Sequence, residues 1–165
     1  MKSGELLHKI TLTAGVLVTA ILMVSVFDFA VARSLNDPER TEIEFKRVGV
    51  KLFTEIADTP DKHAKGLMFR TSLGEKEAMI FSFDAPAILK FWMYNTLIPL
   101  SIMFLDGSGK IIDIQDMQPC REKNPDMCLV YVSRGLAKYA IETNIGLPQK
   151  YGIRTGDRAN FKVLR

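Results

Sequence analysis

Apolar and polar positions alternate along much of this chain with a period of two, which is typical of half-buried β-strands. In residues 50–57, for example, Val50 and Leu52 alternate with Lys51. Such alternation, or a short apolar run between turn residues, predicts strands at residues 42–48, 50–57, 79–83, 91–94, 101–105, 110–117, 129–132, 137–143 and 159–164. Many short strands joined by turns predict a mostly β (α+β) fold, a compact antiparallel β-sandwich or barrel.

Two short helices are expected within this β pattern. A capping residue followed by proline, at positions 58–60, predicts a helix over residues 60–65 that Gly66 ends. A single helical turn is expected from Gly146 to about Gly152. The sequence DGSG at 106–109 predicts a tight hairpin turn, because Asp and Gly tolerate positive φ.

The longest apolar run of the region after residue 33 is FWMYNTLIPLSIMF, residues 91–104. Read as strand, turn and strand, it has apolar residues on both faces, so we expect both faces to be covered. Asn95 and Thr96 interrupt the run and should lie at the rim of the core, while Pro99 limits ladder pairing.

The first 32 residues have the pattern of an export signal. Basic residues precede an apolar run at 10–27, and Ala30-Val31-Ala32 stands before Arg33. This pattern predicts a secretory signal peptide cleaved between Ala32 and Arg33; the alternative is an uncleaved membrane anchor. Residues 33–41 are expected to be a flexible linker and residues 42–165 a single domain. The expected location is periplasmic or secreted, or inner-membrane anchored if the leader remains.

Composition restricts the partners. The chain has 165 residues, 47% of them hydrophobic, and a formal net charge of +3. Its charges are spread out rather than clustered, so we expect no nucleic-acid partner and membrane contact only through an uncleaved N-terminal segment. Fingerprints for phosphate loops and dinucleotides are absent, and no cofactor is expected.

Cys120 and Cys128 are the two cysteines of the chain, and the sequence between them is polar and rich in turn residues. In an exported protein, this spacing favours a disulfide. A zinc site is the alternative, but His63 is the single histidine after the leader and lies far away in sequence. We therefore expect no metal site, and we interpret His63 as a surface residue of the first helix.

Four segments, taken in order, resemble those of the domain of unknown function family 192. They are GLMFR at 66–70, FWMYNTLIPL at 91–100, FLDGSGKI at 104–111 and GD at 156–157. The resemblance covers roughly residues 42–164. It implies a small, mostly β domain, exported or membrane-anchored, with no agreed activity.

Two positions depart from the family pattern. The family usually has aspartate where this chain has Ser101, and glycine where it has Ala78. We therefore place no catalytic role on position 101. The loop between the cysteines is a feature of this chain rather than of the shared motifs, so it should serve local stability.

A candidate ligand site combines an apolar platform, an amide and charges, which together suit a small polar ligand. Its residues are Arg70, Trp92, Asn95, Thr96 and Glu142. A structural interpretation stays open: Trp92 as core, Asn95 and Thr96 bonding the turn backbone, and Arg70 in an ion pair with a carboxylate.

Catalytic chemistry has weaker support. His63 has no evident carboxylate partner, which disfavours a serine or cysteine nucleophile. Paired carboxylates for carbohydrate cleavage could come from five acids, Asp106, Asp113, Asp116, Glu142 and Asp157.

The sequence thus favours an exported small-ligand binding or accessory module over an enzyme, and it leaves open whether any catalysis occurs. The alternatives are a carboxylate-dependent hydrolase acting on envelope carbohydrate and a structural partner in an envelope protein complex. A binding module should have a polar-rimmed pocket near Trp92 without a shifted acid. An enzyme should hold a carboxylate of raised pKa there, and a structural partner should expose an apolar patch.

Overall fold

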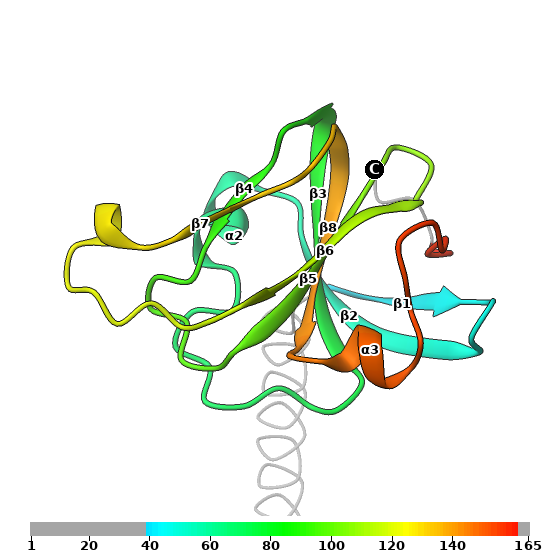
Figure 1. Cartoon of the computed structure of the whole chain (residues 1–165), viewed down its shortest axis with the longest axis horizontal. Coiled ribbons are helices and arrows are strands. Elements are labelled where there is room, and N and C mark those ends of the chain that lie inside the picture. The colour runs from blue at the N-terminus through cyan, green and yellow to red at the C-terminus, as the bar shows by residue number, and fades with distance from the viewer. Residues whose placement is uncertain (1–38, 162–165) are drawn as a thin grey trace, which may run out of the picture. The chain divides into compact units, whose positions relative to one another are not determined.

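The computed structural model describes residues 39–161 (Figure 1). The predicted leader, residues 1–32, and most of the predicted linker lie outside this range. Its elements are β1 (Arg40–Phe45), β2 (Val50–Ala57), α2 (Pro60–Lys65), β3 (Glu77–Ala87), β4 (Lys90–Trp92), β5 (Leu100–Leu105), β6 (Ile111–Met117), the 3-10 helix η1 (Pro125–Met127), β7 (Val130–Val132), β8 (Ala137–Asn144) and α3 (Leu147–Lys150). The fold is mostly β with two short α-helices, as the sequence predicts.

The principal sheet has the strand order β1-β2-β3-β8-β5-β6, and β4 and β7 form a separate two-stranded sheet (Figure 1). The pair β2–β3 is parallel, whereas the other pairs are antiparallel. The sheet is therefore mixed, with one parallel pair within the mostly antiparallel arrangement that the sequence predicts. A parallel pair needs a long crossover connection, and α2 with the loop that follows it supplies one.

The arrangement is sandwich-like, and the sheet does not close into a barrel. Its edge strands are β1 and β6, and the C-terminal segment makes one isolated bridge near each: Asn160 with Glu44, and Arg158 with Lys110. The last strand predicted at 159–164 is accordingly not a regular strand in the described residues up to 161. This segment runs between the two edges instead of pairing continuously with either.

Hydrophobic side chains form two clusters because successive residues of a strand point to opposite faces of the sheet. On β3, Ile80 belongs to one cluster, while Met79 and Phe81 belong to the other. Leu147 of α3 packs in the first cluster, and Leu67, just after α2, packs in the second. The second cluster also contains Met93, at the end of β4, so the small sheet and the segment after α2 cover the same face.

The apolar run at 91–104 is only partly covered, which corrects the expectation that both of its faces are buried. Met93 is 1% exposed, but Trp92 is 43% and Leu97 is 55% exposed. The reason is that the small sheet contacts the core through one face. Trp92 lies directly opposite Val130 of β7, which is also exposed, so the core does not fully cover either side chain.

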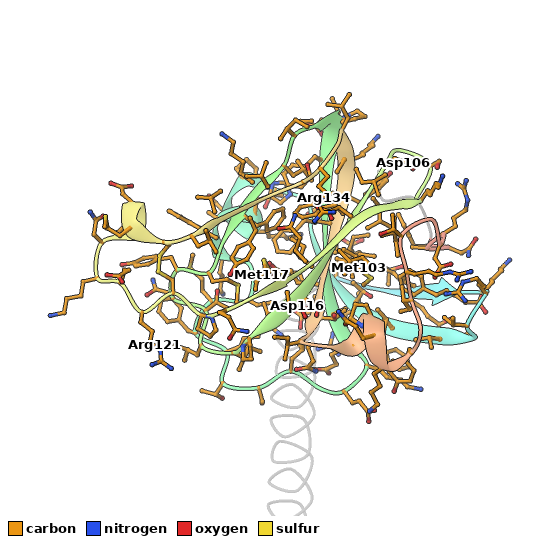
Figure 2. The ribbon with its side chains drawn as sticks, in the orientation of Figure 1. Met103, Asp106, Asp116, Met117, Arg121 and Arg134 are labelled. Carbon is orange, nitrogen blue, oxygen red and sulfur yellow. A yellow bond between two sulfur atoms is a disulfide. The ribbon has the colours of Figure 1, made fainter. Side chains whose placement is uncertain are left out.

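Cys120 and Cys128 form the predicted disulfide, with an S–S distance of 2.05 Å. The loop that they close contains η1 and projects beyond the small sheet. Figure 2 shows Arg121 of this loop directed outward. The amide of Cys120 donates a hydrogen bond to the carbonyl of Met93 at 3.1 Å, which ties the base of the loop to the end of β4.

Replacing both cysteines by serine should lower the free energy of unfolding by about 2–3 kcal/mol, because the unfolded chain gains the entropy that this short loop had lost. Urea denaturation measures the change. A reducing agent should lower the free energy of unfolding of the wild type to that of the variant, and it should leave the stability of the variant unchanged. Equal stability of the oxidised wild type and the variant would contradict the prediction.

Candidate functional site

A cavity of about 130 Å³ opens on the face of the sheet that carries the second hydrophobic cluster. Its walls come from α2 and the segment after it, from β3, from β4, from the turn that follows β4, and from β8. The lining residues are His63, Ala64, Lys65, Gly66, Leu67, Met68, Phe81, Phe83, Lys90, Phe91, Trp92, Thr96 and Glu142. Distant parts of the sequence therefore meet around one small space.

Glu142 is the one carboxylate that lines this cavity. It lies near the middle of β8, directly opposite Met79 of β3 and Ile102 of β5, and it is 4% exposed. Both neighbours are apolar and buried. Among residues 39–161, no side chain or amide forms a hydrogen bond or ion pair with its carboxyl group. No fully enclosed side-chain oxygen of these residues lacks a partner, so the carboxyl oxygens of Glu142 are open to the cavity.

Burial raises the pKa of Glu142 to about 8, from an ordinary value of 4.5. The cause is desolvation: a charged carboxylate loses its hydration in this setting and gains no compensating partner. At neutral pH the group is therefore mostly protonated. In that form it can both donate and accept a hydrogen bond.

His63 lies against the sheet, so its interpretation as a surface residue was wrong. Its ring stacks on Phe83, with centroids 4.4 Å apart, and its Nε2 lies 3.0 Å from the carbonyl oxygen of Ala57 and 3.1 Å from that of Ser82. Carbonyl oxygens only accept, so Nε2 carries a hydrogen and donates it.

Aromatic rings form much of the remaining wall. Phe91 contacts Phe81 edge to face with centroids 4.9 Å apart, and Phe83 similarly at 6.4 Å. Trp92 lies at the rim, where its partial exposure leaves ring surface accessible to a ligand. The cavity thus combines an apolar, aromatic wall with one buried acid.

Thr96 lines the cavity and is buried, and its hydroxyl donates to the carbonyl of Tyr94 at 3.4 Å. Asn95 is not among the lining residues. It adopts a φ of 54°, a left-handed conformation that asparagine tolerates better than most residues, and its carbonyl accepts a hydrogen bond from the amide of Phe69 at 2.8 Å. Asn95 therefore shapes the turn that places Thr96 and Trp92.

Arg70 forms the ion pair with a carboxylate that the structural interpretation expected. Its two terminal nitrogens donate to the two oxygens of Glu55 at 2.8 and 2.5 Å. The hydrogen bonds from Arg70 lower the pKa of Glu55, and Arg70 is not among the residues that line the cavity. Of the five predicted site residues, the structure brings together Trp92, Thr96 and Glu142.

Replacing Arg70 by methionine should lower the free energy of unfolding at pH 7 by about 1–2 kcal/mol. The estimate is modest because the Arg70 side chain is 32% exposed and Arg40 also lies 3.8 Å from Glu55. Because the pKa of Glu55 is lowered in the fold, this contribution is present above its unfolded pKa and is lost as pH falls through the folded value. Urea denaturation at pH 7 and at pH 3 measures both effects.

A double-mutant cycle supplies the control for this ion pair. Changing Glu55 to glutamine together with Arg70→Met should cost clearly less than the sum of the two single changes, because each single change already removes the pair. Strictly additive costs would show that the contact contributes no stability.

The other four acids singled out from the sequence have structural partners away from this cavity. Asp106 accepts hydrogen bonds from the amides of Ser108 and Lys110, at 2.8 and 3.0 Å, and Asp157 pairs with Arg47. Gln115 donates to Asp113 at 2.6 Å, and Ser101 donates to Asp116. Figure 2 shows Asp106 and Asp116 far apart along the β5–β6 hairpin.

The two positions that depart from the family pattern are buried in the sheet. The hydroxyl of Ser101 donates to Asp116 and accepts a hydrogen bond from the amide of Gly146 at 2.9 Å. Ala78 is 2% exposed and lies opposite Thr143 of β8. Ser101 thus links β5 to β6 and to the turn before α3.

Within the described part of the chain, no three side chains of His, Cys, Asp or Glu gather as they would to hold a metal ion. Among residues 39–161, no helix has the length and apolar character needed to cross a bilayer.

Sequence reasoning missed His63 and the phenylalanines as parts of the site. The alternation of Phe81 and Phe83 shows that they share a face of β3, but it does not reveal which helix covers that face. The link between His63 and Phe83 depends on the path of the crossover from β2 to β3, for which a single sequence gives no local signal.

The sequence is similar to those of two proteins named UPF0127 proteins. A UPF0127 protein of Thermococcus sibiricus is 28% identical over 109 residues, which make up 66% of this chain and 66% of that protein, so the match spans just under two thirds of that relative. A UPF0127 protein of Pyrococcus abyssi is 28% identical over 107 residues, 65% of this chain and 84% of that protein.

Two solved structures share the fold. That of a protein of unknown function from Novosphingobium aromaticivorans is 33% identical, with a TM-score of 0.63, over 73% of this chain and 83% of the other. That of a putative transcription regulator from Sinorhizobium meliloti is 28% identical, with a TM-score of 0.65, over 74% of this chain and 92% of the other. The model of the family DUF192, described as Uncharacterized ACR, matches residues 43–161, and the chain therefore belongs to that family.

Proposed function

We propose that this domain is a small-ligand binding module and that the cavity beside α2 is its binding site. The observation that carries the proposal is Glu142, a buried and unpartnered carboxyl group in an aromatic cavity. A ligand that enters the cavity would stack on the accessible ring of Trp92 and bond to this group.

The free-energy cost of Glu142 supports a role in binding. An apolar side chain between Met79 and Ile102 would pack without losing hydration, whereas a carboxyl group without a partner destabilises the fold. Buried polar groups in proteins are almost always hydrogen-bonded. Among residues 39–161 no fully enclosed side-chain oxygen lacks a partner, so the Glu142 oxygens face the cavity, where a ligand can replace water as their partner.

General acid or base catalysis is the second candidate, and a specific observation favours it. A binding module was expected to lack a shifted acid, yet the pKa of Glu142 is raised to about 8 inside the cavity. A carboxyl group with a pKa near neutrality suits proton transfer. The lining argues against carbohydrate cleavage. Glu142 is the single acid among the lining residues, whereas glycoside hydrolysis ordinarily uses two carboxyl groups.

A structural role in an envelope complex has its own supporting observation. Exposed apolar side chains gather on the small sheet and beside it: Ile88, Trp92, Leu129, Val130 and Val132. Such a surface is typical of a protein contact. Trp92 belongs both to the lining of the cavity and to this exposed apolar surface. Replacing Trp92 alone therefore does not distinguish ligand binding from a protein contact.

A thermal-shift screen of the purified protein tests ligand binding. The panel should include sugars, short peptides, amines, carboxylates and phosphate, each at millimolar concentration. A ligand at a hundred times its dissociation constant adds about 2.7 kcal/mol of stability and raises Tm by several degrees. We expect a hit whose shift falls sharply in Glu142→Gln and Trp92→Ala.

Leu97→Ala is the matched control, because Leu97 is 55% exposed and does not line the cavity. It should preserve the shift. A panel without any hit, or a hit that Glu142→Gln leaves unchanged, would contradict the proposed site.

We also propose that the domain works outside the cytoplasm. The support is the predicted signal peptide together with the disulfide, since such bonds persist in oxidising compartments. Intact-mass measurement of the protein recovered from cells should find Arg33 as the first residue. A chain that retains its leader in a soluble cytoplasmic fraction would contradict export.

A further inference from the structure

We propose that the cavity binds a protonated primary amine on a short aliphatic or aromatic stem, with the ammonium group against Glu142 and the stem against the aromatic wall. This inference rests on the proposed binding function and names the ligand class of the same site. Three features carry it: the charge around Glu142, the wall of the cavity and the internal hydrogen bonds of Thr96 and His63.

The surroundings of Glu142 leave it without a counter-ion. Its neighbours on β3 and β5 are Met79 and Ile102, which bear no charge. Desolvation is the cause of its raised pKa, and no cation among residues 39–161 lowers it. Glu142 therefore has no counter-ion among residues 39–161, and a bound cation would take that role as the carboxyl group gives up its proton.

The other ionisable groups at or near the cavity do not act as a counter-ion for Glu142. Lys65 follows His63 on α2 and lowers the pKa of Glu55 rather than that of Glu142. Lys65 and Lys90 both line the cavity, but their side chains are exposed, so water and salt screen their charges. Glu55, the acid two strands away on β2, is already paired with Arg70.

The wall suits a cation on an apolar stem. Three phenylalanines and a tryptophan line the cavity, namely Phe81, Phe83, Phe91 and Trp92. Aromatic faces attract ammonium groups, and tryptophan does so most strongly. A space of about 130 Å³ is close to the size that holds one benzene ring, so it accommodates a short stem rather than a whole oligosaccharide.

Two of the polar groups that line the cavity already have partners within the protein. The hydroxyl of Thr96 donates to Tyr94, and Nε2 of His63 donates to two backbone carbonyls. A sugar ring buried here would leave several hydroxyl groups unpaired, whereas an amine needs one strong acceptor.

Binding of an ammonium group should displace a proton from Glu142. The pKa of Glu142 in the free protein is about 8, so below that pH the affinity should rise roughly tenfold per pH unit as the carboxylate becomes available. At pH 7 about 0.9 proton should be released per ligand bound. A neutral ligand of the same shape should release none.

Benzylamine, benzyl alcohol and benzoate form a matched set of probes, cationic, neutral and anionic. Calorimetry with the purified protein at pH 6 and pH 7, in two buffers of different ionisation enthalpy, gives both the affinity and the proton release. We expect benzylamine to bind about tenfold more tightly at pH 7 than at pH 6, with proton release. Glu142→Gln should weaken it by at least tenfold, while Leu97→Ala should leave it unchanged.

The proton release is measured on the wild type, so the test stands even if Glu142→Gln folds poorly. Equal and pH-independent binding of benzyl alcohol would overturn the amine class while leaving the binding site in place. Binding of benzoate alone would do the same. If none of the three probes binds, the amine class is overturned, and the thermal-shift panel then decides separately whether the cavity binds any ligand.

Discussion

Glu142→Gln is expected to remove most of the pH dependence of folding stability between pH 5 and pH 9. In the wild type, the pKa of Glu142 is about 8 in the folded state and near 4.5 in the unfolded state. Between these values the folded protein keeps a proton that the unfolded chain has released, so stability falls as pH rises. Glu142 alone should account for a loss of about 4 kcal/mol from pH 5 to pH 9.

The comparison with the variant isolates this residue. The lowered pKa values of Glu55, Glu75 and Asp157 contribute stability that is lost at acidic pH, in the opposite direction and in a lower window. These groups are present in both proteins, so their contributions cancel in the difference in stability between the wild type and Glu142→Gln. Near pH 5 the two proteins should have similar stability, and at pH 9 the variant should be the more stable.

Urea denaturation at each pH measures the effect, and Glu122→Gln is the matched control. Glu122 is exposed on the loop between the cysteines. The same chemical change there should leave the decrease of stability with pH as it is in the wild type. A wild type whose stability stays constant or rises from pH 5 to pH 9 would show that Glu142 is solvated or paired.

Phe81→Ala should lower the free energy of unfolding by about 3–5 kcal/mol. Phe81 is 1% exposed, packs in the second hydrophobic cluster and contacts both Phe91 and the ring of His63. Its loss removes a large buried surface and leaves a void between β3 and β4. The same change widens the cavity, so any ligand that stacks on this wall should bind more weakly.

Phe53→Ala is the control for this prediction. Phe53 lies on the neighbouring strand β2 but is 57% exposed, so its loss should alter the free energy of unfolding by well under 1 kcal/mol. Both values come from urea denaturation with a common slope. A cost for Phe81→Ala as small as that for Phe53→Ala would mean that this part of the core is loosely packed.

Elements fixed by local signals could be predicted from the sequence. The bounds of β2 agree with the prediction because its alternating pattern ends at a helix-capping sequence. Thr59 accepts a hydrogen bond from the amide of Lys62, and α2 spans the predicted residues. The disulfide also followed from local spacing and the predicted compartment.

Features that depend on packing between distant segments could not be predicted. Parallel pairing of β2 with β3 depends on the crossover through α2, and the exposure of Trp92 depends on β7 pairing beside it. Glu142 was selected as one acid among several. Its burial arises because β3 and β5 flank β8, and no pattern within residues 137–144 specifies those neighbours.

The most direct test of the central claim is a carbon-13 NMR titration of the Glu142 carboxyl carbon in the free protein, assigned by comparison with Glu142→Gln. The claim is that Glu142 is a solitary, protonated acid in a ligand cavity. The structure predicts a titration midpoint near pH 8, which an amine ligand should shift downward. A midpoint between pH 4 and pH 5 would contradict the claim and, with it, the proposed site.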